Sequence, residues 1–179
     1  QVPCLFLASA WGAGGVAYIL LKAVRRLLPI AIEPFVGEGG PVPLTSVQLG
    51  AYVATALFFA YAEGYKGFQK KFSPLVVSRS RTLIVGTSSY LHILLAPFYS
   101  MGLFHATKKR MTVSWCVTLG VAAIVAAVKR LPYPWRNVVD GGVVVGLTWG
   151  TASIIWGFLR ALATGESPAD AALPGSDKK

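Results

Sequence analysis

The chain has 179 residues, of which 54 % are hydrophobic and only 13 % are charged. Because a soluble domain usually carries about 25 % charged residues, this composition argues against a water-soluble protein. The net charge of +10 would suit nucleic acid, but the basic residues lie in short loops beside apolar blocks. We therefore expect membrane lipids or acidic loops of other subunits as partners, and no nucleic acid.

Five apolar blocks come near the length of about 20 residues that a membrane-spanning helix needs. They cover residues 4–21, 47–62, 82–107, 111–128 and 141–159. The third block contains Pro97, which should kink its helix because proline lacks a backbone N–H. We predict an all-α integral membrane protein with about five transmembrane helices and a short interfacial helix between the second and third. A single transmembrane domain, 1–163, is followed by a polar, extended tail, 164–179, which we expect neighbouring subunits to hold.

The segment 61–81 is basic and aromatic, and it joins the second and third predicted spans. At about 100° per residue, its apolar side chains fall on one arc and its lysines lie outside that arc. This pattern is typical of a helix lying in the membrane interface, with lysines that reach lipid phosphates; an ordinary basic loop is the alternative. The residues predicted to contact lipid or a partner subunit are Lys66, Phe68, Lys70, Lys71, Phe72, Arg79 and Arg81.

Three polar residues near the spans are predicted to have structural roles. Glu63 lies at the inner edge of the second span, and Lys66 follows at the spacing of a helical ion pair. Asp140 precedes the fifth span, where its carboxylate can cap the first free backbone amides, with Arg136 as a partner. An ionisable group at membrane depth is often functional, so Glu63 also carries an alternative role on a proton or ion path.

Gly142, Gly146 and Gly150 are spaced by four residues and therefore share one face of the fifth span. This small-xxx-small pattern allows another helix to approach closely. It predicts helix packing, against a helix of this chain or of another subunit.

His92 and His105 are candidate pigment ligands within the third predicted span. A neutral imidazole can bind a porphyrin-type metal through one ring nitrogen, and hydrogen bonds to a neighbouring helix are the alternative. On one helix, their spacing cannot serve a single compact metal site, so we predict no metal site. Chlorophyll, carotenoid and structural lipids are the candidate cofactors, none of them certain.

The sequence lacks the residue clusters that membrane enzymes use. Di-iron bundles need several Glu residues with Glu-x-x-His pairs, and Mg²⁺-dependent lipid transferases need clustered aspartates. Neither pattern is present, and there is no glycine-rich phosphate loop or nucleophile elbow. We predict no catalytic residues and no enzyme; convergence of Glu63, His105 and Asp140 on one cavity would argue otherwise.

Three runs of sequence carry a resemblance to a known group of proteins: YAEGYKGFQKKFSP, LLAPFYSMGLFHATKKR and LPYPWRNVVDGGVVVGLTWG. Together they resemble a small family of uncharacterised integral membrane proteins of bacterial and cyanobacterial type. The resemblance covers about 61–150 and marks Glu63, His105, Arg136 and Asp140 as motif positions. The family has no established activity, so the resemblance implies a membrane location and assigns no role to these residues.

We expect a non-catalytic accessory or scaffold subunit of a large membrane complex. The leading hypothesis for that complex is a photosynthetic supercomplex of photosystem I type in the thylakoid membrane of an algal plastid. The alternative is a small oligomeric transporter or channel, with Glu63 or His92 on its ion path.

Overall fold

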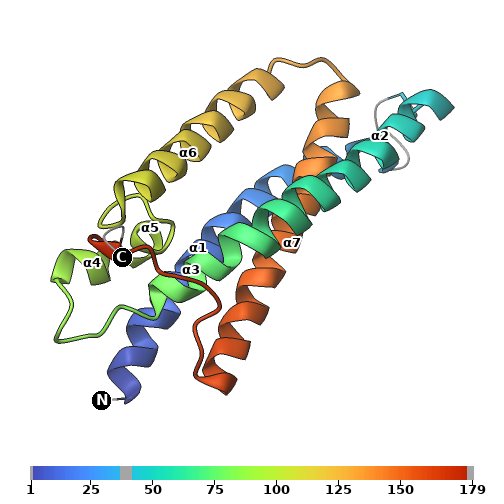
Figure 1. Ribbon diagram of the computed structural model, residues 1–179. Helices are drawn as coiled ribbons and strands as arrows, with labels where there is room; N and C mark the ends of the chain where they lie inside the picture. The colour runs from blue at the N-terminus through green and yellow to red at the C-terminus, as the bar shows by residue number, and fades with distance from the viewer. Residues whose placement is uncertain (1, 37–41, 177–179) are drawn as a thin grey trace.

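The structure is a computed structural model that describes residues 2–36 and 42–176, with side chains from Phe6 onward. It is all-helical, as predicted, with 77 % helix and no strand in the described part. Three long helical runs lie side by side in Figure 1: α1 (Val2–Ile32), a run over residues 46–80, and α7 (Trp135–Thr164). These three runs form the body of the protein.

The second run is continuous from Ser46 to Ser80, through α2 (Ser46–Phe59), the π-helix η2 (Ala60–Phe72) and α3 (Ser73–Ser80). Thr45 begins it with a capping box, in which Thr45 and Gln48 each bind the other's backbone N–H. Pro74 lies in the first turn of α3, where a missing N–H is tolerated. The predicted separate interfacial helix is therefore wrong. Residues 61–80 extend the second helix, because their apolar arc packs on other helices of the chain.

The third predicted span is also wrong. Residues 82–107 contain only two five-residue helices, α4 (Tyr90–Leu94) and α5 (Ala96–Ser100), with turns around them. Gly86, before α4, and Gly102, after α5, adopt positive φ angles, which allow the chain to turn at both places. Pro97 lies in the first turn of α5, so it helps to start a new helix and does not kink a long one.

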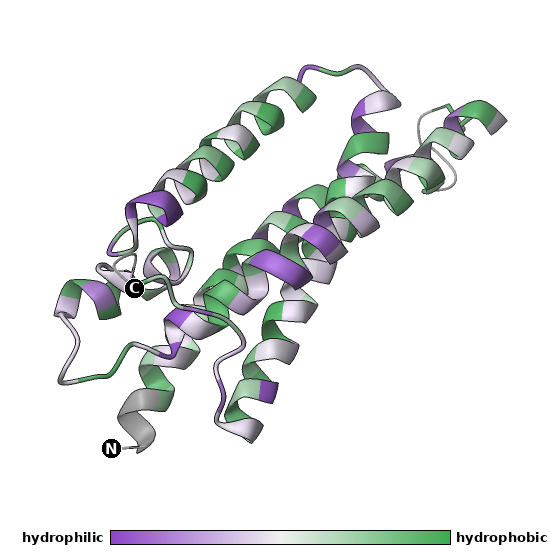
Figure 2. Cartoon of the chain, viewed as in Figure 1, coloured by the Kyte–Doolittle hydropathy of each residue, from purple (hydrophilic) through white to green (hydrophobic). Residues whose placement is uncertain are grey.

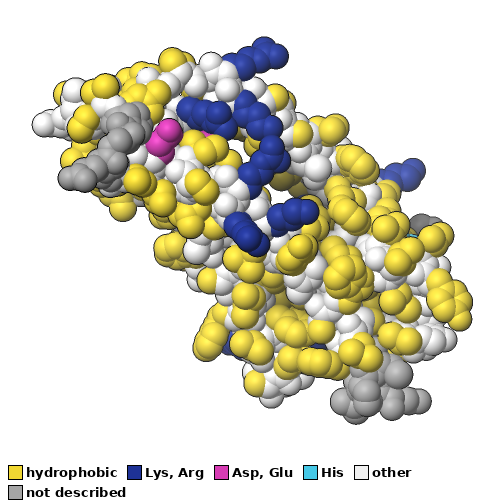
Figure 3. Space-filling model, turned by 180° about the vertical axis from the view of Figure 1, so that it is seen from behind, with side chains coloured by type: hydrophobic (Ala, Val, Ile, Leu, Met, Phe, Trp, Pro, Cys, Tyr) yellow, Lys and Arg dark blue, Asp and Glu magenta, His cyan; other side chains and the backbone are white. Residues whose placement is uncertain are grey.

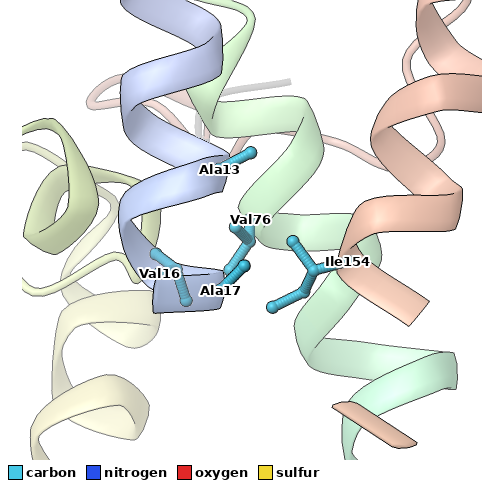
Figure 4. Packing of buried hydrophobic residues seen from close by; sticks show 5 residues of the cluster. All are labelled: Ala13, Val16, Ala17, Val76 and Ile154. Carbon is cyan, nitrogen blue, oxygen red and sulfur yellow. The ribbon is translucent and has the colours of Figure 1, made fainter. Parts of the chain in front are cut away.

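Small side chains fill the main core and bring the helices close together. Figure 4 shows Ala13, Val16 and Ala17 of α1 facing Val76 of α3 and Ile154 of α7, all at most 5 % exposed. A second core lies where the N-terminal half of α1 meets the short helices. Its buried members are Ala8, Leu83, Ala96 and Tyr99.

Helix α6 (Lys108–Val128) stands apart from the bundle along most of its length (Figure 1). In the described residues, α6 and α7 are the two helices long and apolar enough to cross a membrane, with mean hydropathies of 2.1 and 1.6. Only 6 % of the apolar stretch of α6 is buried, against 33 % for α7. Figure 2 shows hydrophobic residues along most of α6, beyond its hydrophilic first turn. These two helices favour a membrane location; the five predicted spans are not confirmed.

Candidate functional site

Arg79 is the most connected polar side chain of the described structure, and it is fully buried. Its Nε donates to the Tyr99 carbonyl at 2.7 Å, and its Nη atoms donate to four further backbone carbonyls. The guanidinium also lies 4.5 Å from the centre of the Tyr99 ring. The prediction that Arg79 contacts lipid is therefore wrong. A guanidinium has five N–H donors, and here they bind carbonyls of α5, of the segment before α6 and of the C-terminal tail.

The C-terminal tail is held by the same chain. Arg79 binds the carbonyls of Ala171 and Ala172, and Arg81 binds those of Ala161, Gly165 and Glu166. In addition, the backbone N–H of Ala169 donates to the Ser78 hydroxyl at 2.9 Å. The tail is extended, as predicted, but its contacts overturn the expectation that neighbouring subunits must hold it. Arg81 was also predicted to contact lipid, but its guanidinium donates hydrogen bonds to the carbonyls of Ala161, Gly165 and Glu166.

His92 and His105 come together, although their spacing on one predicted helix would have kept them apart. Their ring centres are 4.4 Å apart, because the chain folds back between α4 and α6. His105 has a φ of 49°, which few non-glycine residues adopt. Partial desolvation of its ring, and then the nearby His92 and Arg79, hold the pKa of the largely exposed His105 below its usual value of 6.5. Within residues 2–36 and 42–176, no group of three His, Cys, Asp or Glu side chains is arranged to hold a metal ion.

The glycines of α7 face the second helical run of the same chain. A Cβ atom at Gly142 would lie 2.6 Å from the Phe59 ring, and one at Gly150 would lie 2.5 Å from the Phe68 ring. A Cβ at Gly146 would lie 2.9 Å from a carboxylate oxygen of Glu63. These glycines therefore pack against a helix of this chain. The sequence had left open whether the partner helix belongs to this chain or to another subunit. Phe68 and Phe72 pack within this body and are not free to contact lipid as predicted.

Glu63 does not form the predicted ion pair with Lys66. The carboxylate of Glu63 is half-buried against Gly146, while the exposed Lys66 places its Nζ 4.9 Å from the centre of the Tyr61 ring. Lys70 lies over Tyr65 in the same way, at 5.3 Å. The π-electrons of the exposed tyrosines attract these lysines outward, and this leaves Glu63 without an ionic partner among the described residues.

Asp140 is not the N-terminal cap of its helix. Helix α7 begins at Trp135, so Asp140 lies in the second turn. Its carboxylate instead pairs with Arg136 one turn earlier, at 3.4 Å, which is the partner that the sequence predicted. Since His105 lies against His92 and Tyr99, Glu63, His105 and Asp140 each have different neighbours. The convergence that would argue for a lipid enzyme is not observed.

A groove of about 920 Å³ runs between η2, α3, α7 and the start of the tail. Trp149 and Trp156 of α7 form its apolar wall, and Lys70 and Arg160 add positive charge. The indole N–H of Trp149 donates to the Gln69 side chain at 2.7 Å and so fixes one edge. Of the residues predicted to contact lipid, Lys70 lines this groove. The groove was not predicted from the sequence, although Trp149, Trp156 and Arg160 have the spacing of one helix face.

Comparisons of the chain with protein-family models, with curated proteins and with solved structures gave no match. The resemblance of its three motifs to uncharacterised bacterial membrane proteins therefore stays a prediction.

Proposed function

We propose that the protein is a non-catalytic accessory subunit of a larger membrane assembly, and that α6 is its contact surface for other subunits. The observation that carries this proposal is the isolation of α6, whose apolar stretch is only 6 % buried. Leu119, Val121 and Ile124 expose 62 %, 52 % and 60 % of their surfaces. The apolar surface of α6 is not buried by the rest of the described chain, so another molecule must contact it.

The sequence of α6 suits close contact with another helix. A Cβ at Gly120 would meet no atom within 4 Å, so this face of α6 is open. Alanines follow at 122, 123, 126 and 127. Helices in membranes associate through such small residues, because lipid tails give no hydrophobic driving force between helices. Lipid alone would cover α6 without any need for this run of small residues, which favours a protein partner.

The ends of α6 are fixed, so its surface is presented in a defined place. The Ser114 hydroxyl donates to the Met101 carbonyl at 2.8 Å, and the Trp115 indole donates to the Leu103 carbonyl at 2.9 Å. At the other end, a short turn joins α6 to α7. Figure 3 shows the molecule from behind, with a largely hydrophobic face on which several Lys and Arg side chains lie near one another and a few others lie apart. Such a surface suits the contacts of a membrane subunit with apolar spans and acidic loops or lipid head groups.

Gentle detergent purification followed by mass spectrometry of the co-purifying proteins tests this proposal. We expect stoichiometric recovery of at least one different membrane polypeptide. A homogeneous oligomer of this chain alone would contradict the accessory role.

The narrower proposal is that the assembly is a photosynthetic supercomplex in an algal plastid. It is supported by analogy with assemblies that recruit small membrane subunits of bacterial type, and by the histidine pair as a candidate pigment contact. The absorption spectrum of the same purified material tests it. Chlorophyll bands and photosystem subunits are the expected result, and a colourless preparation would overturn this form of the proposal.

A second candidate function, a small oligomeric transporter or channel, is favoured by Glu63. Its carboxylate lies at the contact between η2 and α7 with no ionic partner, and unpaired acids at such depth often serve ion pathways. Flux in proteoliposomes separates the two functions. Loss of flux in Glu63→Gln but not in Glu166→Gln, with assembly intact, would favour the transporter; no flux in the unmodified protein would exclude it.

A further inference from the structure

We propose that three exposed basic side chains of α1, those of Lys22, Arg25 and Arg26, bind carboxylates of a partner subunit. The partner presents these carboxylates on an apolar helix, in the middle of its membrane span. This inference deepens the accessory role proposed above and rests on it. It assigns a partner chemistry to a surface of α1 that lies outside α6.

The contacts between α1 and α7 determine where along the bundle these basic side chains lie. The two helices are antiparallel: Asn137 of α7 donates a hydrogen bond to the Ile30 carbonyl, and Ile154 packs in one cluster with Ala17. Residues 22–26 of α1 lie between these two contacts. They are therefore level with the part of α7 between its residues 137 and 154. Since α7 is apolar and long enough to cross a membrane, this level lies inside the bilayer.

Helix α6 covers the same levels of the bundle. Near its base, the Ser114 hydroxyl donates to the Met101 carbonyl, and Met101 packs against the cluster that contains Ala17. Beyond its other end, a short turn leads into α7 close to Asn137. The exposed apolar surface of α6 thus extends past the level of residues 22–26. A bilayer that surrounds α6 also surrounds the three basic side chains of α1.

The basic side chains interrupt an exposed apolar face of α1. At about 100° per residue, this face contains, in chain order, Leu7, Trp11, Tyr18, Lys22, Arg25 and Ile32. Its four apolar members expose between 45 and 63 % of their surfaces, and Arg26 lies at its edge. Basic residues that anchor a helix at the membrane surface lie near a helix end, with apolar residues on one side only. Here apolar residues lie on both sides, which indicates charges within the membrane.

The described part of the chain does not neutralise these charges. Lys22, Arg25 and Arg26 are all exposed, and within residues 2–36 and 42–176 the one ion pair joins Arg136 to Asp140. Charged side chains at membrane depth are costly, so they pair with other groups or face water. Three positive charges within two turns of one helix also repel one another. The compensating negative charge therefore comes from another molecule.

The surroundings of the three residues favour carboxylates of a protein over the other sources of negative charge. Phospholipid phosphates lie at the surfaces of a bilayer, and at the level of residues 22–26 only acyl chains are present. A water-filled ion path would need polar neighbours, but Leu21 and Leu28 beside the charges are apolar and 47 % and 42 % exposed. An apolar helix with Asp or Glu satisfies both parts of this face. Its carboxylate can accept two parallel hydrogen bonds from one guanidinium, while its apolar residues cover the leucines.

Cross-linking of the full chain in its native membranes identifies the molecule that contacts this face. A photoreactive residue replaces Leu21, which is exposed beside Lys22, and the cross-linked peptide is sequenced by mass spectrometry. We expect an apolar peptide that contains Asp or Glu, from a different membrane polypeptide. Adducts with lipid alone, or with a peptide that has no acidic residue, would overturn the proposal.

Substitutions of Arg25 test whether its charge binds the partner. Arg25→Gln should lower the recovery of the partner polypeptide in detergent about ten-fold, because truncating one member of a buried charge pair weakens binding. Arg25→Lys keeps the charge and should retain most of the partner. Arg130→Gln is the matched control, since it removes an exposed arginine from the turn after α6 and should leave recovery unchanged.

The two proposals fail in different ways. Equal recovery of the partner by Arg25→Gln and Arg130→Gln would overturn the role of the α1 charges and leave the accessory role intact. Absence of any different polypeptide, even with the unmodified protein, would contradict the accessory role itself. Because Arg25 is exposed, its variants should fold, and equal thermal unfolding midpoints of all three variants would show that a loss of partner is not a loss of fold.

Discussion

The Nε of Arg79 donates to the backbone carbonyl of Tyr99 over 2.7 Å, across 20 residues of sequence. The aromatic ring of the same Tyr99 lies against the guanidinium. Through its remaining donors, Arg79 binds the segment before α6 and the C-terminal tail. One buried cation thus helps to hold the base of α6 against the helical bundle, together with the bonds of Ser114 and Trp115.

Replacing Arg79 with Gln should release both the tail and the segment before α6. Several buried carbonyls would lose a charged donor, and hydrogen bonds to charged groups each contribute about 1.5–3 kcal/mol. We expect the free energy of unfolding to fall by about 3 kcal/mol or more, and protease cleavage between 165 and 176 to become fast. Arg130→Gln, which removes an exposed arginine, should change neither. Equal protection of the tail in Arg79→Gln and the unmodified protein would contradict the role of Arg79.

Gly150→Ala should destabilise the protein, because its Cβ would lie 2.5 Å from the ring of Phe68. Phe68 in turn packs edge-on against Phe72, so the ring cannot move freely. Overpacking of this kind costs about 1–3 kcal/mol, measured as the free energy of unfolding in detergent. Gly120→Ala on α6 is the control. With no atom within 4 Å of its Cβ position, it should be neutral or stabilising, since alanine favours helix over glycine. The opposite ranking of the two variants would refute internal packing by the α7 glycines.

His105 should make the protein less stable in mild acid. Because partial desolvation, His92 and Arg79 hold the pKa of His105 below 6.5, the unfolded chain binds a proton more readily than the folded chain. The contribution of neutral His105 to stability is therefore complete above pH 6.5 and is lost as the pH falls below that value. Thermal unfolding of the unmodified protein should shift downward between about pH 7.5 and pH 5.5.

His105→Asn tests this prediction, because asparagine tolerates positive φ and does not titrate. The variant should lose part of the downward shift while keeping its unfolding temperature near pH 7.5. An unchanged pH dependence would show that His105 is not the group responsible.

Asn137 of α7 joins the end of α1 to the bundle. Its side-chain amide donates to the Ile30 carbonyl at 2.8 Å and to the Glu33 carboxylate at 2.6 Å. Asn137→Leu should lower the free energy of unfolding by about 1–3 kcal/mol, because two hydrogen bonds between α7 and the end of α1 are lost, one of them to a charged carboxylate. Thr148→Val is the comparison, since that hydroxyl bonds only within its own helix. Equal unfolding midpoints for the two variants would show that Asn137 does not hold α1.

The sequence predicted the helical class, the tail, the packing face of Gly142, Gly146 and Gly150, and the pairing of Asp140 with Arg136. These features depend on local spacing or on composition, which can be recognised in one sequence. The third span was mispredicted because residues 82–107 lack charge. Hydropathy alone does not distinguish a spanning helix from turns whose polar backbone is satisfied by a distant side chain, and that side chain is Arg79.

Arg79 itself was misassigned for a related reason. In the sequence, Arg79 follows Lys70 and Lys71 in a basic segment of the kind that lies at a membrane surface. Only the fold shows that the Arg79 side chain points from α3 into the protein. The pairing of His92 with His105 was missed because it depends on the same chain reversal. Glu63 was assigned to Lys66 by helical spacing, but the exposed Tyr61 and Tyr65 rings draw the lysines outward.

The most direct test of the accessory role is site-specific photo-cross-linking from α6 in native membranes. A photoreactive residue at Leu119 or Ile124 occupies the exposed apolar surface, and one at Tyr90, which is 92 % exposed outside α6, serves as the control. We predict that the two α6 positions give a strong adduct with one different membrane polypeptide, and that Tyr90 does not. Adducts from α6 only with a second copy of this chain, or only with lipid, would contradict the proposal.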